Sequence, residues 1–240
     1  MLSPDQRFVL RNLVEKAGDL CGKALFALGY FAGCRVSDVA HLLMEHTYVG
    51  PKIGWLHVGH KGEKFRDIDL LNEARRPLYD YIQHGGREKA SPYVFTSQRS
   101  PHLTEDGIHS WFRVLKQQAS KEEWELIAPL SFHDLRHDFA HRAREAGWTL
   151  EEVAYYLGHV TTRGTPAIQT TVRYTQVSRA GERKVETDEG IRFSRSPRLV
   201  EHVPQTWASR RPFRGGVRVL IIHLNRIQSA EIRRDEHPSR

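Results

Sequence analysis

The stretch that decides the fold runs from residue 130 to residue 174 and reads LSFHDLRHDFAHRAREAGWTLEEVAYYLGHVTTRGTPAIQTTVRY. Ser131 is placed to cap a helix that Gly147 ends. Thr149 and Glu152 then form the capping-box pattern of a second helix, which ends at Gly158. We therefore expect two helices joined by a tight turn, followed by a polar loop over residues 161–169.

The same stretch carries four reactive side chains. His133 and Arg136 are about one helical turn apart. His159 directly follows the glycine that ends the second helix, and Tyr174 lies in a last helix that we expect Thr170 to cap. Taken singly, each has a structural explanation, such as a helix cap or a half-buried aromatic residue. Their order in the chain is what favours a functional interpretation.

Upstream, Arg35 lies between two predicted helices. Apolar spacing predicts helices over residues 4–17 and 20–31, and Ser37 is expected to cap a short third helix. Gly33 ends the second helix, so Arg35 falls in the turn that follows. An arginine held tightly in such a turn is well suited to clamp a phosphate. This favours a functional role over that of a solvated surface arginine.

A β-hairpin is predicted over residues 53–70, where the apolar period changes to about two. Its tip carries Lys61, although most basic turn tips are merely solvated. Beyond it we expect helices over residues 72–83 and 105–119, capped by Asn72 and Thr104, and a short extended piece over residues 93–96. Lys116 and Lys121 are expected to be solvated, with phosphate contacts as the alternative.

Composition excludes several classes of protein. The chain has 240 residues, of which 39% are hydrophobic, enough for a packed core, and no apolar run is long enough to cross a membrane. The first residues do not resemble a signal peptide. Cys21 and Cys34 are too few for a disulfide framework or a four-cysteine zinc site. These features favour a cytoplasmic protein without contact to a membrane.

The net charge of +7 is concentrated near the C-terminus. Residues 181–240 carry 13 Lys and Arg against 8 Asp and Glu, a net charge of +5. We expect residues 1–180 to form one domain and residues 181–240 to be a basic, mostly irregular extension.

The sequence has no phosphate-binding G-x-x-x-x-G-K-[ST] motif, no H-E-x-x-H and no G-x-S-x-G. We therefore expect neither a cofactor nor a metal, and the His133–His137 pair fits a structural role as well as a ligand role.

The remaining chemistry is metal-free phosphoryl transfer on a nucleic-acid backbone. A tyrosine hydroxyl has a pKa near ~10 and needs assistance to act as a nucleophile. Two arginines can hold the non-bridging oxygens, a lysine can protonate the leaving 5′ oxygen, and a histidine can assist removal of the tyrosine proton. A covalent phosphotyrosine would conserve the energy of the broken bond, so resealing needs no cofactor.

Five strings of this sequence together resemble the tyrosine recombinase (phage integrase) family. They are GCRVSDV, HKGEKFRDIDL, SFHDLRHDFA, YYLGH and TTVRYT, and they span about residues 3–180. The resemblance implies six catalytic residues, which are Arg35, Lys61, His133, Arg136, His159 and Tyr174. It makes Arg35 and Arg136 the phosphate clamp, Lys61 the general acid and Tyr174 the nucleophile. His133 would act as acid or base and His159 would assist through a hydrogen bond, with Asp38 and Asp134 orienting the arginines.

Two departures from the family pattern shape the expectations. The second histidine precedes the tyrosine by fifteen residues here, against about nine in the family, and a loop absorbs such a difference at small entropic cost. The family's separate helical DNA-binding domain is expected to be absent before residue 1, which implies weaker DNA binding. The resemblance implies double-stranded DNA as substrate, a tetramer on DNA, and an accessory recombinase or DNA-bending protein as a further partner.

The expected fold is α+β and mainly helical, with a small antiparallel sheet at one edge. The expected function is site-specific DNA cleavage and rejoining through a 3′-phosphotyrosine. Three alternatives remain at this point. They are a DNA-relaxing enzyme of the type IB topoisomerase kind, a non-enzymatic remnant that still binds DNA, and a helical domain with a basic tail.

Overall fold

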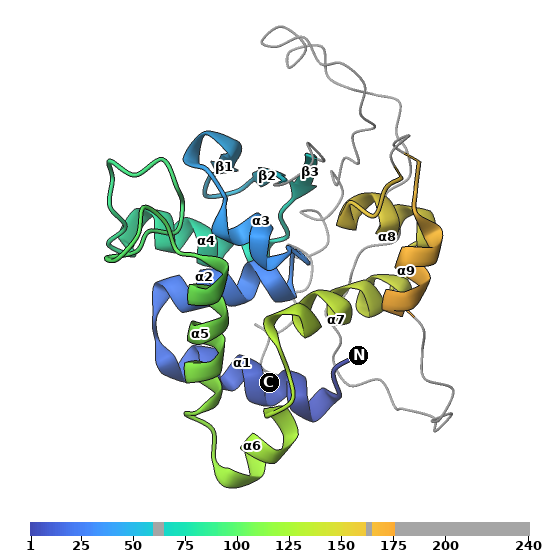
Figure 1. Ribbon diagram of the computed structural model, residues 1–240, viewed down its shortest axis with the longest axis horizontal. Coiled ribbons are helices and arrows are strands. Elements are labelled where there is room, and N and C mark those ends of the chain that lie inside the picture. The colour runs from blue at the N-terminus through green and yellow to red at the C-terminus, as the bar shows by residue number, and fades with distance from the viewer. Residues whose placement is uncertain (60–64, 162–164, 176–240) are drawn as a thin grey trace, which may run out of the picture.

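The computed structural model describes residues 1–59, 65–161 and 165–175. Its helices lie below and beside a small sheet, and α7 crosses the middle of the molecule with α8 and α9 next to it (Figure 1). The elements in chain order are α1 (Pro4–Ala17), α2 (Leu20–Tyr30), α3 (Val36–Ala40), the 3-10 helix η1 (Met44–His46), β1 (Thr47–Val49), β2 (Gly54–Val58), β3 (Arg66–Asp69), α4 (Asn72–His84), α5 (Glu105–Lys116), α6 (Lys121–Ile127), α7 (Phe132–Glu145), α8 (Leu150–Leu157) and α9 (Ile168–Thr175).

The expected α+β class, mainly helical with a small antiparallel sheet, is confirmed. The strands run in the order β1–β2–β3, and β2 and β3 form the predicted hairpin, with Leu56 paired to Ile68 and Val58 paired to Arg66. Leu56, Val58 and Ile68 are buried, so one face of the sheet covers the core. Strand β1 was not predicted, because three residues are too short for an alternating pattern to be recognised. The predicted hairpin tip with Lys61 lies outside the described residues.

Helix α2 forms the centre of the core. Its residues from Ala24 to Tyr30 are all buried, because the helix is apolar on every side and is surrounded by other elements. Helices α4 and α7 pack against it. The predicted extended piece is also present, since Tyr93 forms an isolated antiparallel bridge with Leu43. Helix α1 contributes Val9 to the core, whereas its Phe8 is exposed.

Most predicted helix starts are confirmed, and three are corrected. The hydroxyls of Ser3, Thr104 and Thr149 accept backbone N–H groups as caps, and Ser131 caps α7. Helix α3 begins before Ser37, because the Asp38 carboxylate accepts the backbone N–H of Arg35 and caps the helix there. Asn72 is the first residue of α4 rather than its cap, and α9 begins two residues before Thr170.

A buried carboxylate joins α1 to α7. Asp138 is fully buried and accepts the backbone N–H of Leu2, the guanidinium of Arg7 and the Nε of Arg142, the last at 2.8 Å. A buried charge requires this degree of pairing, because an unpaired carboxylate in the core would cost several kcal/mol. The network fixes how α7, which carries Arg136, lies against the N-terminal helix.

The helix α6 was not predicted, and it changes the interpretation of Lys116. The Lys116 side chain is buried, and its Nζ donates to the carbonyl oxygens of Ile127, Ala128 and Leu130 at 2.6–3.3 Å. These carbonyls lie at and beyond the C-terminus of α6, where a cation compensates the unpaired acceptors. Lys116 is therefore a structural residue, and the expectation that it is solvated was wrong.

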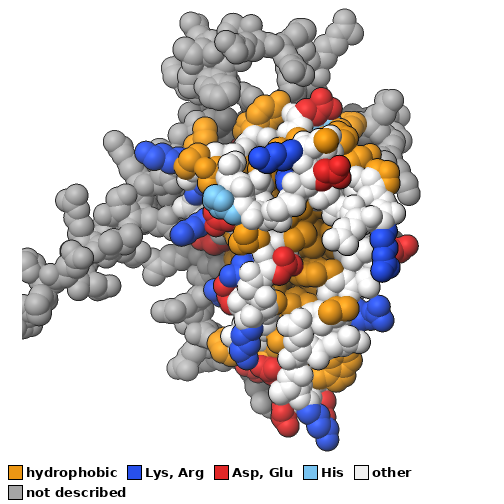
Figure 2. Space-filling model, turned by 90° about the vertical axis from the view of Figure 1, so that its left-hand side faces the viewer, with side chains coloured by type: hydrophobic (Ala, Val, Ile, Leu, Met, Phe, Trp, Pro, Cys, Tyr) orange, Lys and Arg blue, Asp and Glu red, His pale blue; other side chains and the backbone are white. Residues whose placement is uncertain are grey.

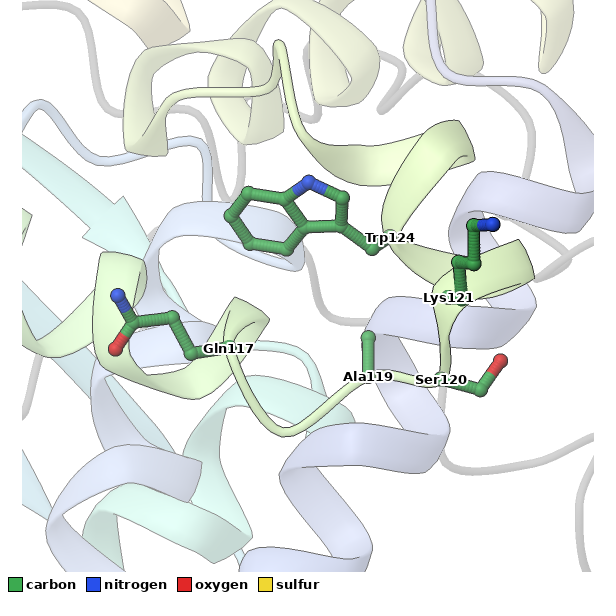
Figure 3. Close-up of a pocket in the computed structure, with 5 residues that line it drawn as sticks. All are labelled: Gln117, Ala119, Ser120, Lys121 and Trp124. Carbon is green, nitrogen blue, oxygen red and sulfur yellow. The ribbon is translucent and has the colours of Figure 1, made fainter.

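A shallow hollow of about 320 Å³ lies between α5 and α6. It is lined by Gln117, Ala119, Ser120, Lys121 and Trp124, and the Trp124 indole lies across it (Figure 3). Figure 1 shows α6 at the opposite end of the molecule from α8 and β3.

On the face of the molecule that is at the left in Figure 1, basic and acidic side chains are interspersed around apolar ones (Figure 2). Within the described residues, no helix is both long enough and apolar enough to span a membrane.

Replacing Lys116 by methionine should destabilise the domain by about 2–4 kcal/mol, because three carbonyls lose a charged donor while the apolar stem is kept. Urea unfolding followed by circular dichroism measures this change. The matched control is Lys121→Met at an exposed lysine, where we expect a change within about 0.5 kcal/mol. Equal effects at the two positions would contradict the structural role of Lys116.

Candidate active site at the C-terminal end of α8

Three consecutive backbone carbonyls at the end of α8 each accept a hydrogen bond from a different arginine. Tyr156 O accepts from Arg66 Nε at 2.9 Å, Leu157 O from Arg136 Nη2 at 2.6 Å, and Gly158 O from Arg35 Nη2 at 3.2 Å. A helix C-terminus leaves its last carbonyls without intrahelical partners and carries partial negative charge. Three guanidinium groups from three different elements are gathered there as a result.

Arg35 is held by its backbone as well as by its side chain. It precedes α3 directly, and its N–H donates to Asp38 Oδ2 at 2.9 Å. The preceding turn requires Gly33, because φ is +60° there and a Cβ would lie 2.6 Å from the Phe139 ring. The predicted placement of Arg35 in a tight Gly-Cys turn is thus what the structure shows, and the side chain is half-buried.

Arg136 lies deepest of the three arginines and is 0% exposed. Besides Leu157 O, its guanidinium donates to Gly33 O at 2.6 Å and to His159 Nε2 at 3.1 Å. One side chain on α7 therefore joins the turn before α3 to the end of α8. The structure brings Arg35, Arg136 and His159 together, although they are far apart in the sequence.

Arg66 is a site residue that the sequence reasoning missed. It bonds Asp38 Oδ2 at 2.6 Å in a largely buried ion pair, and a Cβ on Gly158 would lie 2.9 Å from its Cδ. Burial would raise the pKa of Asp38, but the charge and hydrogen bonds of Arg66 outweigh it and hold that pKa below its ordinary value. Strand register is the sequence signal that could have identified Arg66. It lies two residues before the buried Ile68 on the same strand, so the two side chains share one face of the sheet.

His159 is buried and neutral. Burial and the charges of Arg136 and Arg35 lower its pKa to about 3. Its Nε2 faces Arg136 and its Nδ1 lies 3.1 Å from Thr171 Oγ1. The sequence reasoning missed Thr171 as well, since one threonine in a polar stretch carries no distinguishing signal.

His133 lies in the first turn of α7, and its side chain is exposed at the surface. Its ring meets that of His137 edge-on, with centroids 4.7 Å apart. Partial desolvation, then the neighbouring His137 and Arg136, lower the pKa of His133 below its ordinary value, which favours the neutral ring. The Asp134 carboxylate, which was expected to orient an arginine, instead accepts the N–H and hydroxyl of Ser131 and caps α7.

The long spacing between His159 and Tyr174 is taken up by a closed loop. Val160 pairs with Pro166 in an isolated antiparallel bridge, and Ala167 N–H donates to His159 O at 2.6 Å. The chain therefore returns to His159 before α9 begins, and Tyr174 lies in that helix. Lys61 lies outside the described residues. Within the described part of the chain, no group of three or more His, Cys, Asp or Glu is placed to hold a metal ion.

Residues 2–180 match the model of the phage integrase family. The chain belongs to this family. The match covers all six sequence-predicted site residues and ends where the basic extension was predicted to begin. This match confirms the resemblance to the family that the sequence motifs indicated.

Curated relatives of this integrase-family chain are named tyrosine recombinases. It is 29% identical to tyrosine recombinase XerD of Halalkalibacterium halodurans over 170 residues, covering 69% of this chain and 52% of that protein. It is 28% identical to tyrosine recombinase XerC of Oceanobacillus iheyensis, covering 73% of this chain and 55% of that protein. The chain thus spans about half the length of these relatives.

Solved structures share the fold. The XerA recombinase crystal structure aligns with a TM-score of 0.60 at 22% identity, covering 75% of this chain and 61% of that one. The Tn1549 transposon integrase, solved in complex with circular intermediate DNA, aligns with a TM-score of 0.59 at 19% identity, covering 75% of this chain and 63% of that one. At these identities the comparison establishes the architecture.

Replacing Asp38 by asparagine should destabilise the domain by about 3–5 kcal/mol at pH 7, because Arg66 would remain buried without its carboxylate. The folded-state pKa of Asp38 lies below its ordinary value of 3.8, so its stabilisation is complete above that value and disappears as pH falls through the folded-state pKa. Urea unfolding between pH 7 and pH 2.5 should show the parent and variant converging below about pH 4. A difference that is constant over this range would contradict the ion pair.

Proposed function

We propose that this chain is the catalytic part of a tyrosine recombinase that cleaves and rejoins double-stranded DNA. The observation that carries the proposal is the gathering of Arg35, Arg136 and neutral His159 at the end of α8, beside the helix that contains Tyr174. Family membership supports the same chemistry. The chain spans only about half the length of its curated relatives. Their activity is therefore proposed for this chain.

The proposed reaction is a transfer of one phosphoryl group in two reversible steps. The Tyr174 oxygen attacks the scissile phosphorus, its proton passing to a base for which His133 is the candidate. The P–O5′ bond breaks, Lys61 protonates the leaving 5′ oxygen, and a 3′-phosphotyrosine remains. A 5′ hydroxyl of the partner strand then attacks the phosphotyrosine and gives its proton to Lys61, while the protonated base returns a proton to the departing tyrosine oxygen.

In this proposal Arg35 and Arg136 stabilise the negative charge that develops on the non-bridging oxygens. Arg35 is half-buried and adjoins the surface, whereas Arg136 is 0% exposed and donates to two carbonyls and to His159. A direct contact between Arg136 and a phosphate therefore requires that DNA binding opens this arrangement. With the arrangement closed, Arg136 acts on the phosphate through its charge and by holding the end of α8 in place.

The partners follow from the same proposal. Double-stranded DNA is the substrate, and strand exchange between two duplexes requires several copies of the chain, for which a tetramer is the proposed assembly. The net charge of +5 on residues 181–240 supports an additional, sequence-independent contribution to DNA binding.

The parent protein should form a covalent complex with DNA that Tyr174→Phe abolishes. The substrate is a pool of duplexes flanking the gene of origin, nicked near candidate cleavage positions so that the complex accumulates, and the readout is a denaturing gel. The phenylalanine variant should bind the same DNA with unchanged affinity, because only the hydroxyl is lost. DNA binding without a covalent band in the parent would favour a non-enzymatic DNA-binding protein, and relaxation of supercoils by a monomer would favour a topoisomerase.

The assignment of Lys61 as general acid predicts a specific rescue. Lys61→Ala should slow cleavage of ordinary DNA by roughly 10²–10⁴-fold. A substrate with sulfur in place of the bridging 5′ oxygen should restore the rate, because a thiolate leaves without a proton. Arg35→Ala is the matched control, since the charge on the non-bridging oxygens still requires stabilisation and the sulfur substrate should not rescue it. Equal rescue of both variants, or of neither, would contradict the assignment.

A further inference from the structure

Thr171 lies where the helix that carries the proposed nucleophile meets the buried arginine cluster. Its side chain is 0% exposed, and its Oγ1 lies 3.1 Å from His159 Nδ1 and 3.4 Å from Ala167 O. Thr170, its neighbour in the same turn of α9, is exposed. Neither solubility nor apolar packing accounts for a buried hydroxyl placed next to a buried imidazole.

The hydrogen bonds around His159 select one tautomer of the ring. An arginine side chain can only donate, so the contact of 3.1 Å between Arg136 Nη2 and His159 Nε2 makes Nε2 the acceptor. A neutral imidazole then carries its proton on Nδ1, which donates to Thr171 Oγ1. The threonine hydroxyl in turn donates to Ala167 O. These three hydrogen bonds therefore run in one consistent direction, from Arg136 through His159 and Thr171 to Ala167.

The same chain of hydrogen bonds joins two separate parts of the structure. At one end, Arg136 extends from α7 and ties the turn before α3 to the end of α8. At the other end, Thr171 belongs to α9, three residues before Tyr174. The backbone bond from Ala167 N–H to His159 O closes the intervening loop, so α9 starts beside the same histidine. The rotation and position of α9 are thereby tied to the arginine cluster.

We propose that Thr171 is a positioning residue whose hydroxyl holds His159 as the Nδ1–H tautomer and so fixes the helix of Tyr174 relative to Arg136. The tautomer is a property of the folded protein alone. The effect on DNA cleavage rests on the proposed function, so the test has one readout that needs no DNA and one that does.

The first readout is nitrogen-15 NMR of the imidazole rings in histidine-labelled protein at pH 7. The chain has 14 histidines, so the His159 signals are identified by their loss in His159→Gln. The parent should show protonated Nδ1 and unprotonated Nε2. Thr171→Ser keeps the hydroxyl and should keep this pattern, whereas the isosteric Thr171→Val should lose the hydrogen-bonded Nδ1 proton signal and lower the Nδ1–H population.

The second readout is the rate of covalent complex formation with nicked DNA. Thr171→Val removes the hydroxyl that accepts the His159 Nδ1–H and should slow the reaction roughly tenfold to a hundredfold at unchanged DNA affinity, with a lower melting temperature because a buried hydrogen bond is lost. Thr171→Ser should stay close to the parent. Thr170→Val is the matched control, because it makes the same chemical change at the exposed neighbour, and neither readout should move.

Five outcomes decide the proposal. A tautomer change in Thr171→Val, with slower cleavage and rescue by serine, supports it. An Nε2–H tautomer in the parent, or an unchanged His159 spectrum in Thr171→Val, overturns it. A changed tautomer with unchanged cleavage overturns the positioning role. If the parent forms no Tyr174-dependent complex, the proposed function fails, while the NMR result still decides whether Thr171 sets the tautomer.

Discussion

The structure around the candidate site depends on the unpaired carbonyls at the end of α8. A helix must find external donors for its last carbonyl groups, and here Tyr156, Leu157 and Gly158 each receive an arginine N–H. The three arginines come from a strand, from α7 and from the turn before α3. The elements that carry the candidate catalytic residues therefore converge on one helix terminus, which fixes their relative positions without a bound ligand.

Gathering three guanidinium groups has an electrostatic cost that the surroundings offset. The Asp38 carboxylate pairs with Arg66, and the negative end of the α8 dipole faces all three side chains. His159 stays neutral, since burial and the adjacent arginines lower its pKa to about 3, so it adds no further positive charge. The cluster keeps a net positive charge next to the surface at Arg35, as the proposed stabilisation of a phosphate requires.

Backbone hydrogen bonds close the loop between His159 and α9 at its base. The loop between His159 and α9 is longer than the family pattern, but the Val160–Pro166 bridge and the bond from Ala167 to His159 close it at its base. The start of α9 and its link to His159 are thus set by bonds at the base of the loop. A local insertion is thus compatible with an unchanged geometry of the buried arginine cluster, because closing a slightly longer loop costs little entropy.

Much of the local structure could be predicted because it depends on neighbours in the sequence. The caps at Ser3, Thr104 and Thr149, the stop at Gly158 and the pairing of residues 54–58 with 66–69 arise from contacts within a few residues. The short elements β1 and α6 were missed because three to seven residues show no reliable period. The burial of Lys116 was missed with α6, whose terminal carbonyls it binds.

The sequence by itself determined the types and order of the candidate site residues, from Arg35 through His133 and Arg136 to Tyr174, and thereby the family. Only the tertiary structure decided that Arg136 is completely buried and that Arg66 and Thr171 belong to the site. The physical reason is that these roles depend on hydrogen bonds across large sequence separations, such as that from Arg136 to Gly33. Such bonds follow from the packing of whole helices, which no local pattern specifies.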